Sequence, residues 1–280
     1  SMVVAVVVTL ALHAPGNLVV AAPFLALWGL SPLIARWASH APATEPHRDL
    51  APADRDALRL AARRTWRFFE TFVTAEDNWL PPDNYQDAPH EEIAPRTSPT
   101  NIGMLLLSTA SAWDLGYLGR SELAARTANL FDSLGRLERY RGHFYNWYDT
   151  KSLQPLEPRY VSTVDSGNLA VCLVAYAAAL REASAETSLE SQRWEGLNDT
   201  LDIIEEASQE WDSDEFRQQR SEIRSRLSEL RTDSQNTMTG LAELCETDIP
   251  RLEAAIAQAG AAPASVPVRY LREIYNSIDR

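Results

Sequence analysis

The feature that most constrains the fold is an alternation between segments of helical periodicity and long loops rich in aromatic and polar residues. Apolar residues recur at steps of three and four over 58–73, 102–113 and 123–137, which places them on one helical face each time. Ser98 followed by Pro99 is a typical helix start, and the last two segments are joined by a short connection. The pattern predicts an all-α fold built from helix hairpins.

Two loops interrupt these helices. The first runs from Thr74 to Gly103 and holds five prolines, and the second runs from Arg141 to Ala170. Loops longer than about 12–15 residues are uncommon in compact domains and are usually functional. Both loops combine aromatic rings with planar Asp, Asn and Arg side chains. The candidate site residues are Trp79, Asp83, Asn84, Tyr85, Arg96, Asn101, Tyr145, Asn146, Trp147, Asp149, Asp165 and Asn168.

This mixture of residues is typical of sites that bind carbohydrates. The apolar C–H faces of a pyranose ring stack on aromatic rings, and its hydroxyls pair with planar side chains that satisfy two neighbours at once. If the helix pairs gather their loops at one end, the two loops line a common cleft. The alternative is that both are well-packed loops whose polar groups satisfy the backbone of turns.

The loops do not single out a catalytic pair. Glycoside chemistry needs two carboxyl groups about 5 to 9.5 Å apart, and no spacing selects two of the six loop acids. The sequence has no nucleophile elbow, P-loop or dinucleotide fingerprint, and its five histidines form no HxxxH or HExxH pair. We therefore predict no catalytic residue, no metal and no cofactor in this chain. Cys172 and Cys245 are expected to be buried, reduced thiols.

The first forty residues form a separate hydrophobic segment. Two apolar runs, 3–12 and 18–37, are separated by "HAPGN". The second run has the length of about 20 residues that a bilayer-spanning helix needs, and Pro23 and Pro32 are tolerated in such a helix. We predict transmembrane-like helices that contact a lipid bilayer through residues 3–37. The alternative is a hydrophobic hairpin buried in a soluble fold.

The sequence changes character again after Ser184, where charged, helix-favouring residues dominate. Ile223 and Leu227 belong to a narrow apolar stripe, which predicts long solvated helices in a hairpin that projects from the body. Much of the net charge of −13 lies here, and such a charge excludes nucleic acid as a partner. The expected domains are a hydrophobic membrane segment (1–40), a helix-and-loop domain (41–183) and an acidic helical region (184–280).

Four long motifs carry a resemblance to a known family. They are "RTWRFFETFVTAEDNWLPPDNYQ", "RTSPTNIGMLLLSTASAWDLGYL", "LERYRGHFYNWYDT" and "PRYVSTVDSGNLA". In this order they resemble the bacterial cyclic β-1,2-glucan synthases, over about Leu18 to Leu180. The acidic region matches that family only in general character.

The resemblance implies a fold and a role. Those synthases are large inner-membrane proteins. A membrane-embedded transferase builds linear β-1,2-glucan from UDP-glucose, a glucoamylase-like (α/α)6 domain closes the chain by retaining transglycosylation, and a phosphorylase-like domain trims its length. The chain resembles the end of the membrane part and the first half of the (α/α)6 domain, a partial barrel. It is then expected at the bacterial inner membrane, with its soluble part facing the cytoplasm.

The same resemblance limits the expected activity. The glutamates that catalyse cyclisation belong to the second half of the barrel, and the transferase that uses UDP-glucose precedes Ser1. The chain is then a fragment that contributes a glucan-binding wall, is inactive alone and acts with the rest of the synthase. Two alternatives remain open: a stand-alone, membrane-attached sugar-binding or scaffold module, and a purely structural helical interaction protein.

Overall fold

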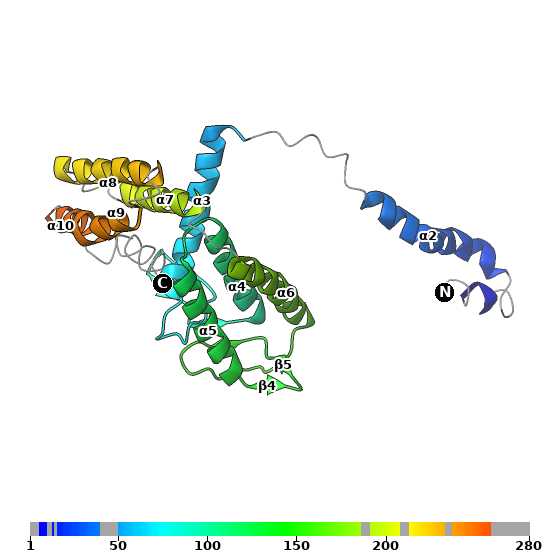
Figure 1. Cartoon of the computed structure of the whole chain (residues 1–280). Coiled ribbons are helices and arrows are strands. Elements are labelled where there is room, and N and C mark those ends of the chain that lie inside the picture. The colour runs from blue at the N-terminus through cyan, green and yellow to red at the C-terminus, as the bar shows by residue number, and fades with distance from the viewer. Residues whose placement is uncertain are drawn as a thin grey trace. The chain divides into compact units, whose positions relative to one another are not determined.

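A computed structural model describes residues 6–9, 13, 16–39, 50–185, 191–207, 213–232 and 237–258. The chain divides into two compact units, Ser1–Ala51 and Pro52–Arg280, which are described separately. Helices dominate both units, and the prediction of an all-α fold is confirmed (Figure 1). Most of the predicted linker between 38 and 52 lies outside the described residues.

The first unit contains one long helix, α2 (Asn17–Ala38), which includes Pro23 and Pro32. Its stretch Val19–Ala38 is long and apolar enough to cross a membrane, and none of this stretch is buried within the protein. Most of the first predicted apolar run, 3–12, lies outside the described residues.

The second unit begins with four helices that carry the two loops. Ser98 caps the second of them, because its Oγ accepts a hydrogen bond from the amide of Asn101 at 3.2 Å. At the start of the fourth, the Oγ of Ser162 accepts from the amide of Asp165 at 3.2 Å. The cap at Ser98 is the one predicted from the sequence. The helices are α3 (Pro52–Phe72), α4 (Pro99–Asp114), α5 (Arg120–Arg136) and α6 (Thr163–Ala185).

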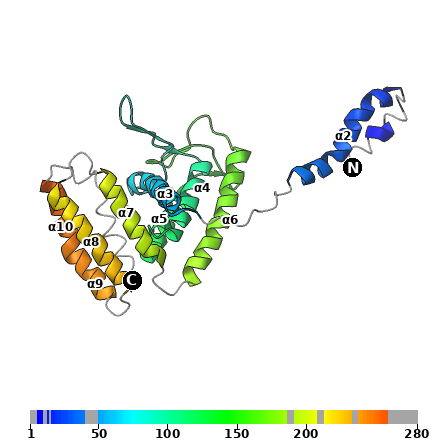
Figure 2. The same ribbon diagram turned by 90° about the horizontal axis from the view of Figure 1, so that it is seen from above.

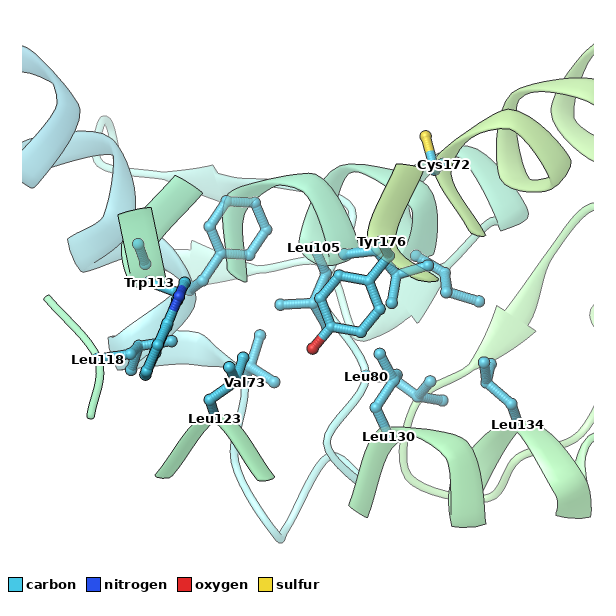
Figure 3. Close-up of a cluster of buried hydrophobic side chains, with 14 of the residues drawn as sticks. Val73, Leu80, Leu105, Trp113, Leu118, Leu123, Leu130, Leu134, Cys172 and Tyr176 are labelled. Carbon is cyan, nitrogen blue, oxygen red and sulfur yellow. The ribbon is translucent and has the colours of Figure 1, made fainter. Parts of the chain in front are cut away.

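These four helices share one hydrophobic core. Helices α4 and α6 lie side by side in both ribbon views (Figures 1 and 2). Their closest approach is at Gly103, where an added Cβ would lie 3.0 Å from the Sγ of Cys172. Leu105, Leu130 and Tyr176 face one another within the core (Figure 3). Cys172 and Cys245 are both buried and free, as expected.

The described residues contain three two-stranded sheets, all in the loops. They pair β1 (Tyr85–Gln86) with β2 (Glu92–Ile93), β3 (Arg96–Thr97) with β6 (Tyr148–Asp149), and β4 (Arg139–Tyr140) with β5 (His143–Phe144), each antiparallel. The residue types of "HFYNWYD" and "RYVSTV" also predict that these two stretches pair as short strands. Only one backbone hydrogen bond joins them, from the amide of Asn146 to the carbonyl of Tyr160 at 2.8 Å. The strands of the second loop instead pair with β3 of the first loop and, across a turn at Arg141–Gly142, with β4.

The acidic region does not form a hairpin that projects into solvent. Its helices pack on one another around a second hydrophobic cluster that includes Leu201, Ile204 and Leu227. The first of these helices also packs along α3 (Figure 2). Their bounds are α7 (Ser191–Ala207), α8 (Asp214–Thr232), α9 (Thr237–Glu243), the π-helix η1 (Leu244–Asp248) and α10 (Ile249–Gln258). We call these helices the acidic bundle.

Candidate functional site

The two long loops meet at the sheet of β3 and β6. Arg96 of the first loop lies opposite Asp149 of the second in the antiparallel register. The amide of Thr150 then donates to the carbonyl of Pro95 at 3.0 Å. Backbone hydrogen bonds therefore join two loops that are far apart in the sequence, and the expectation that they converge agrees with the structure.

A second set of contacts fixes the base of the two loops. Thr150 is fully buried, and its hydroxyl donates to the carboxylate of Asp77 at 2.8 Å. The side-chain amide of Asn78 donates to the carbonyls of Thr150 and Lys151 at 2.8 and 2.9 Å. Asn78 adopts a φ of 52°, a left-handed conformation that asparagine tolerates better than most residues. The base is therefore held by side chains as well as by backbone pairing.

Arg96 connects a carboxylate to an aromatic ring. Its Nη2 and Nε donate to Asp83 at 2.8 and 3.0 Å. The guanidinium lies 4.9 Å from the centre of the Trp147 ring, within range of a cation–π interaction. The side-chain amide of Asn101 donates to the other oxygen of Asp83 at 3.3 Å. Asp83 and Trp147 belong to different loops, so Arg96 ties the two loops together.

Asn146 is a buried polar hub next to this arginine. In the amide orientation that satisfies all its neighbours, Asn146 donates to Asp165 at 3.0 Å. It then accepts from the indole N–H of Trp147 at 2.8 Å and from the hydroxyl of Tyr160 at 2.7 Å. A buried side-chain amide with its donors and acceptor satisfied holds its neighbours rigidly. The orientation of the Trp147 ring is therefore set by Asn146.

Asp165 extends the network to the start of α6. Its carboxylate accepts from the hydroxyl of Thr100 at 2.6 Å and from the hydroxyl of Ser162. The side-chain amide of Asn168 donates to Thr100 at 3.1 Å. Eight of the twelve candidate residues thus lie in one connected network: Asp83, Asn84, Arg96, Asn101, Asn146, Trp147, Asp165 and Asn168.

An open hollow of about 420 Å³ lies beside the junction of the loops. Three of the candidate residues line it: Asn84 and Arg96 from the first loop and Asp149 from the second. Polar side chains from both loops surround it, and Leu156 provides an apolar wall. The lining residues are Asn84, Gln86, Glu92, Ala94, Pro95, Arg96, Asp149 and Leu156.

Asp149 is an ionised acceptor at the edge of this hollow. One carboxylate oxygen accepts from the amides of Ser152 and Lys151 at 2.7 and 3.1 Å. The hydrogen bond from the Ser152 amide is the main reason that the pKa of Asp149 lies below its usual range. Asp149 is therefore suited to accept a hydrogen bond from a ligand hydroxyl and unsuited to donate a proton.

Besides Asp149, three candidate residues lie outside the network. The Trp79 ring is partly buried against the core near Val73 and Leu105, where it borders a very small internal cavity. Tyr85 stacks on Phe72 of α3, with ring centres 4.9 Å apart. Tyr145 packs edge-on against Tyr148 and against the core. Their role as stacking faces for a sugar stays a prediction.

Sequence reasoning missed several residues that build the site. Gln86, Glu92 and Leu156 line the hollow, and Thr100 and Thr150 hold the network together. Gln86 and Glu92 flank the β1–β2 turn and share the polar character of the predicted set, so composition could have included them. Leu156 and Thr150 carry no local signal, because their positions follow from the pairing of distant strands. Among the described residues, no three His, Cys, Asp or Glu side chains gather as metal ligands.

The fold and the site define an all-α protein whose helix hairpins display one connected surface of polar and aromatic loops. Over 193 residues, 69% of its length, the chain is 45% identical to the cyclic β-(1,2)-glucan synthase NdvB of Rhizobium meliloti (strain 1021). The resemblance predicted from the loop motifs is thereby confirmed: the matched part is homologous to a segment of a cyclic β-(1,2)-glucan synthase. That segment spans only 7% of NdvB. The chain matches no protein-family model.

Proposed function

We propose that this chain contributes the glucan-binding wall of the domain that cyclises linear β-1,2-glucan by transglycosylation in a cyclic β-1,2-glucan synthase. The observation that carries the proposal is the union of two distant loops, through β3–β6 and Arg96, around a hollow lined by polar groups. Homology to the synthase supports the choice of β-1,2-glucan as the ligand. The transferase that uses UDP-glucose belongs, in this proposal, to another part of such a synthase.

The chemistry of the hollow supports binding of a neutral sugar. Amide groups of Asn84 and Gln86 offer both donors and acceptors to hydroxyls, and the ionised Asp149 offers an acceptor. Leu156 offers a surface for the C–H face of a pyranose. The cation Arg96 is neutralised by Asp83, so the site does not select an anionic ligand.

The same residues support binding without catalysis. A general acid needs a raised pKa to hold its proton near neutral pH, whereas the pKa of Asp149 is lowered. The carboxylate of Asp165 is occupied by Thr100 and Ser162. In the proposal, the acid and the nucleophile of cyclisation come from other parts of a synthase.

An uncovered apolar face supports a partial (α/α)6 barrel. Val171 and Val174 of α6 are 70% and 73% exposed, and Met104 of the adjacent α4 is 52% exposed. Contiguous exposed apolar residues mark surfaces that are covered by another element. In the proposal, the remaining helices of the barrel cover this face, and domain boundaries follow 1–40, 41–183 and 184–280.

Attachment to the bacterial inner membrane is the second element of the proposal. The length, composition and exposure of α2 favour insertion into a bilayer, with residues 3–37 as the anchor and the rest facing the cytoplasm. A flotation assay with liposomes tests it: the whole chain should float, whereas a chain that starts at residue 50 should stay in the soluble fraction. Equal flotation of both would contradict the anchor.

Glucan binding is tested by titrating linear β-1,2-glucooligosaccharides against the folded chain, by calorimetry and tryptophan fluorescence. Trp147→Ala removes the ring that Arg96 and Asn146 hold and should weaken binding about two- to tenfold, since stacking on an aromatic ring contributes about 0.5–1.5 kcal/mol beyond its area. Tyr140→Ala is the matched control, because that ring is 50% exposed on the β4–β5 hairpin and is not a member of the network that contains Trp147. No binding by the folded wild-type chain would reject the proposed function.

A further inference from the structure

Helix α3 presents a row of arginines to the acidic bundle. Arg55 and Arg59, one helical turn apart, both contact Glu195 of α7, at 2.7 and 3.0 Å. Arg59 also reaches Asp199, one turn further along α7, at 2.8 Å. Residues four apart lie on the same helical face. The two helices therefore meet through matched rows of opposite charge.

A buried polar cluster continues this row. The side chain of Arg63 is fully buried, and it donates to both oxygens of Glu70 at 2.8 and 3.3 Å. Its Nε donates to the hydroxyl of Thr200 on α7 at 3.1 Å. The hydroxyl of Tyr117 donates to Asp199 at 2.9 Å. Arg63 and Tyr117 would each lose a partner if α7 moved away, so the contact is specific and not an incidental approach of two charged surfaces.

Two glycines allow the backbones to touch next to this cluster. Gly116 has a φ of +82°, and a Cβ built on it would lie 2.0 Å from the carbonyl oxygen of Gln192. A Cβ on Gly196 of α7 would lie 2.2 Å from the carbonyl oxygen of Gly116. Arg193 places its guanidinium 3.6 Å from the centre of the Trp113 ring. No side chain fits between the turn and α7 at this point.

The interface is polar, although the elements on either side of it have apolar cores. The buried apolar residues form two separate clusters, one from Trp66 to Ala183 and one from Trp194 to Ile256. Interfaces between domains that are more polar than a continuous core permit the domains to move relative to each other. The acidic bundle therefore has the architecture of a docked module.

Helix α3 connects this interface to the candidate site. The arginine row lies on its first three turns, and its last residue, Phe72, stacks on Tyr85 of the β1–β2 hairpin. The neighbouring residue of that hairpin, Gln86, lines the hollow. Movement of α3 would therefore displace one wall of the hollow.

We propose that the acidic bundle is a releasable brace, docked on α3 and on the turn at Gly116 by ion pairs and a glycine contact, and that docking holds the β1–β2 wall of the hollow in place. The brace itself rests on the described contacts. Only its effect on sugar affinity rests on the proposed function.

The first test uses Gly196→Ala in the full chain, with hydrogen exchange measured by mass spectrometry. Alanine is a better helix former than glycine, so the substitution leaves α7 helical while its Cβ collides with the carbonyl of Gly116. We expect faster exchange in α7 and in residues 85–93, by at least about tenfold, which corresponds to about 1.4 kcal/mol. Gly135→Ala is the matched control, because a Cβ on this helical glycine meets nothing within 4 Å.

Each possible exchange result either supports or contradicts the brace. Unchanged exchange in α7 would show that the glycine contact does not hold the bundle, and the proposal fails. Faster exchange in α7 without a change in 85–93 would remove the link to the hollow, and the proposal fails there. Faster exchange in both segments, with α4 and α6 unchanged, supports it.

A second test exchanges the charges. Arg59→Glu and Asp199→Arg should each release α7 in the same assay, and the double variant should recover part of the protection because the pair is re-formed in reverse. Losses that simply add in the double variant would contradict docking by paired charges. Recovery that restores protection in 85–93 as well as α7 supports the brace.

The sugar readout separates the brace from the proposed function. If the wild-type chain binds β-1,2-glucooligosaccharides, Gly196→Ala should weaken binding and Gly135→Ala should not. Equal affinity of Gly196→Ala and wild type would contradict the link to the hollow. If the wild-type chain binds none, the proposed function is rejected, while the exchange data still decide whether the acidic bundle braces α3.

Discussion

The loop-bearing half of the second unit, 52–185, and the acidic bundle, 191–258, differ in their cores and in how they use their polar side chains. The first surrounds an aromatic-rich core, and its polar side chains are engaged in ordering two loops. The second surrounds a core that is mainly aliphatic, with Trp194 and Phe216, and its charges form ion pairs near the surface, such as Arg220 with Glu205. Polar groups thus build a site in one half and mainly an outer shell in the other.

The contrast shows where the identity of a charged residue matters. Exposed ion pairs contribute about 0–1 kcal/mol each, so the outer shell of the bundle tolerates many charge patterns. The buried members of the loop network and of the contact with α3, such as Asn146 and Arg63, do not, because each depends on particular partners.

The largest expected effect comes from Arg63→Met. It leaves the Glu70 carboxylate buried without its guanidinium, and loss of one partner of a buried pair costs about 3–5 kcal/mol of unfolding free energy. Urea denaturation measures it. Arg64→Met is the control one residue away, because Arg64 forms an exposed pair with Glu206 and its loss should be much smaller. Equal losses would mean that burial does not distinguish the two pairs.

The same variant has a defined dependence on pH. Burial raises the pKa of Glu70 above its usual range, and Arg63 is the main group that opposes this shift, ahead of Arg126. The folded state then binds a proton that the unfolded state releases, so stability falls as pH rises through the raised pKa. The destabilisation of Arg63→Met should therefore be smaller at pH 5 than at pH 8. A larger loss at pH 5 would contradict this assignment.

Cavities introduced into the two hydrophobic clusters should show whether the two halves open independently. Leu106 and Leu227 are almost completely buried, in the first and second cluster respectively, and each leucine-to-alanine change should cost about 2–5 kcal/mol. In hydrogen exchange, Leu227→Ala should increase opening in α7–α10 and leave α4 and α6 protected. Leu106→Ala should do the reverse. Uniform loss of protection over both halves would mean that they form a single cooperative unit.

A smaller effect is expected where α4 and α6 touch. Gly103→Val places a branched side chain against Cys172 and should cost about 1–3 kcal/mol through overpacking. It should also make the Cys172 thiol react faster with a thiol reagent, because α6 is pushed outward. Gly135→Ala, in open space on α5, should instead stabilise the chain by about 0.4–1 kcal/mol. Slow thiol reaction in Gly103→Val would indicate that the helices absorb the extra volume.

The smallest effect concerns the turn at Asp149. Because the folded pKa of Asp149 is lowered, its stabilising effect is present above its ordinary pKa and is lost as pH falls through the folded value. Exchange of the Ser152 amide, corrected for its intrinsic pH dependence, should therefore increase relative to that of Asn101 below about pH 4. Asp149→Asn should abolish this extra increase. An increase that persists in Asp149→Asn would point to another titrating group.

The features that could be predicted from the sequence are those that depend on neighbouring residues. Helical periodicity located the core helices, and Ser98 marked the start of α4 because an N-cap acts on its own next turn. Composition of the loops also selected eight residues that lie in one network. Partners chosen across long distances could not be predicted, because nothing near Arg63 indicates Thr200 and nothing near Thr97 indicates Tyr148.

Two further differences have the same origin. From the sequence, Trp79 is predicted to offer a stacking face to a sugar. In the structure its backbone φ is 58°, and the ring packs partly on the core. The narrow apolar stripe of the acidic region predicts solvated helices. In the structure α7, α8 and α10 bury this stripe by packing on one another. In both cases tertiary packing decides the outcome, and single-residue propensity does not reveal it.

The pairing of β3 with β6 also bears on how the chain acquires its shape. The partners Arg96 and Asp149 are separated by both α4 and α5. Closing such a long loop has an entropic cost that short-range helix formation avoids, and contacts between distant residues slow folding. We therefore expect the helices to assemble first and the surface formed by the two loops last. Variants that weaken β3–β6 should slow the final folding step while leaving helix formation unchanged.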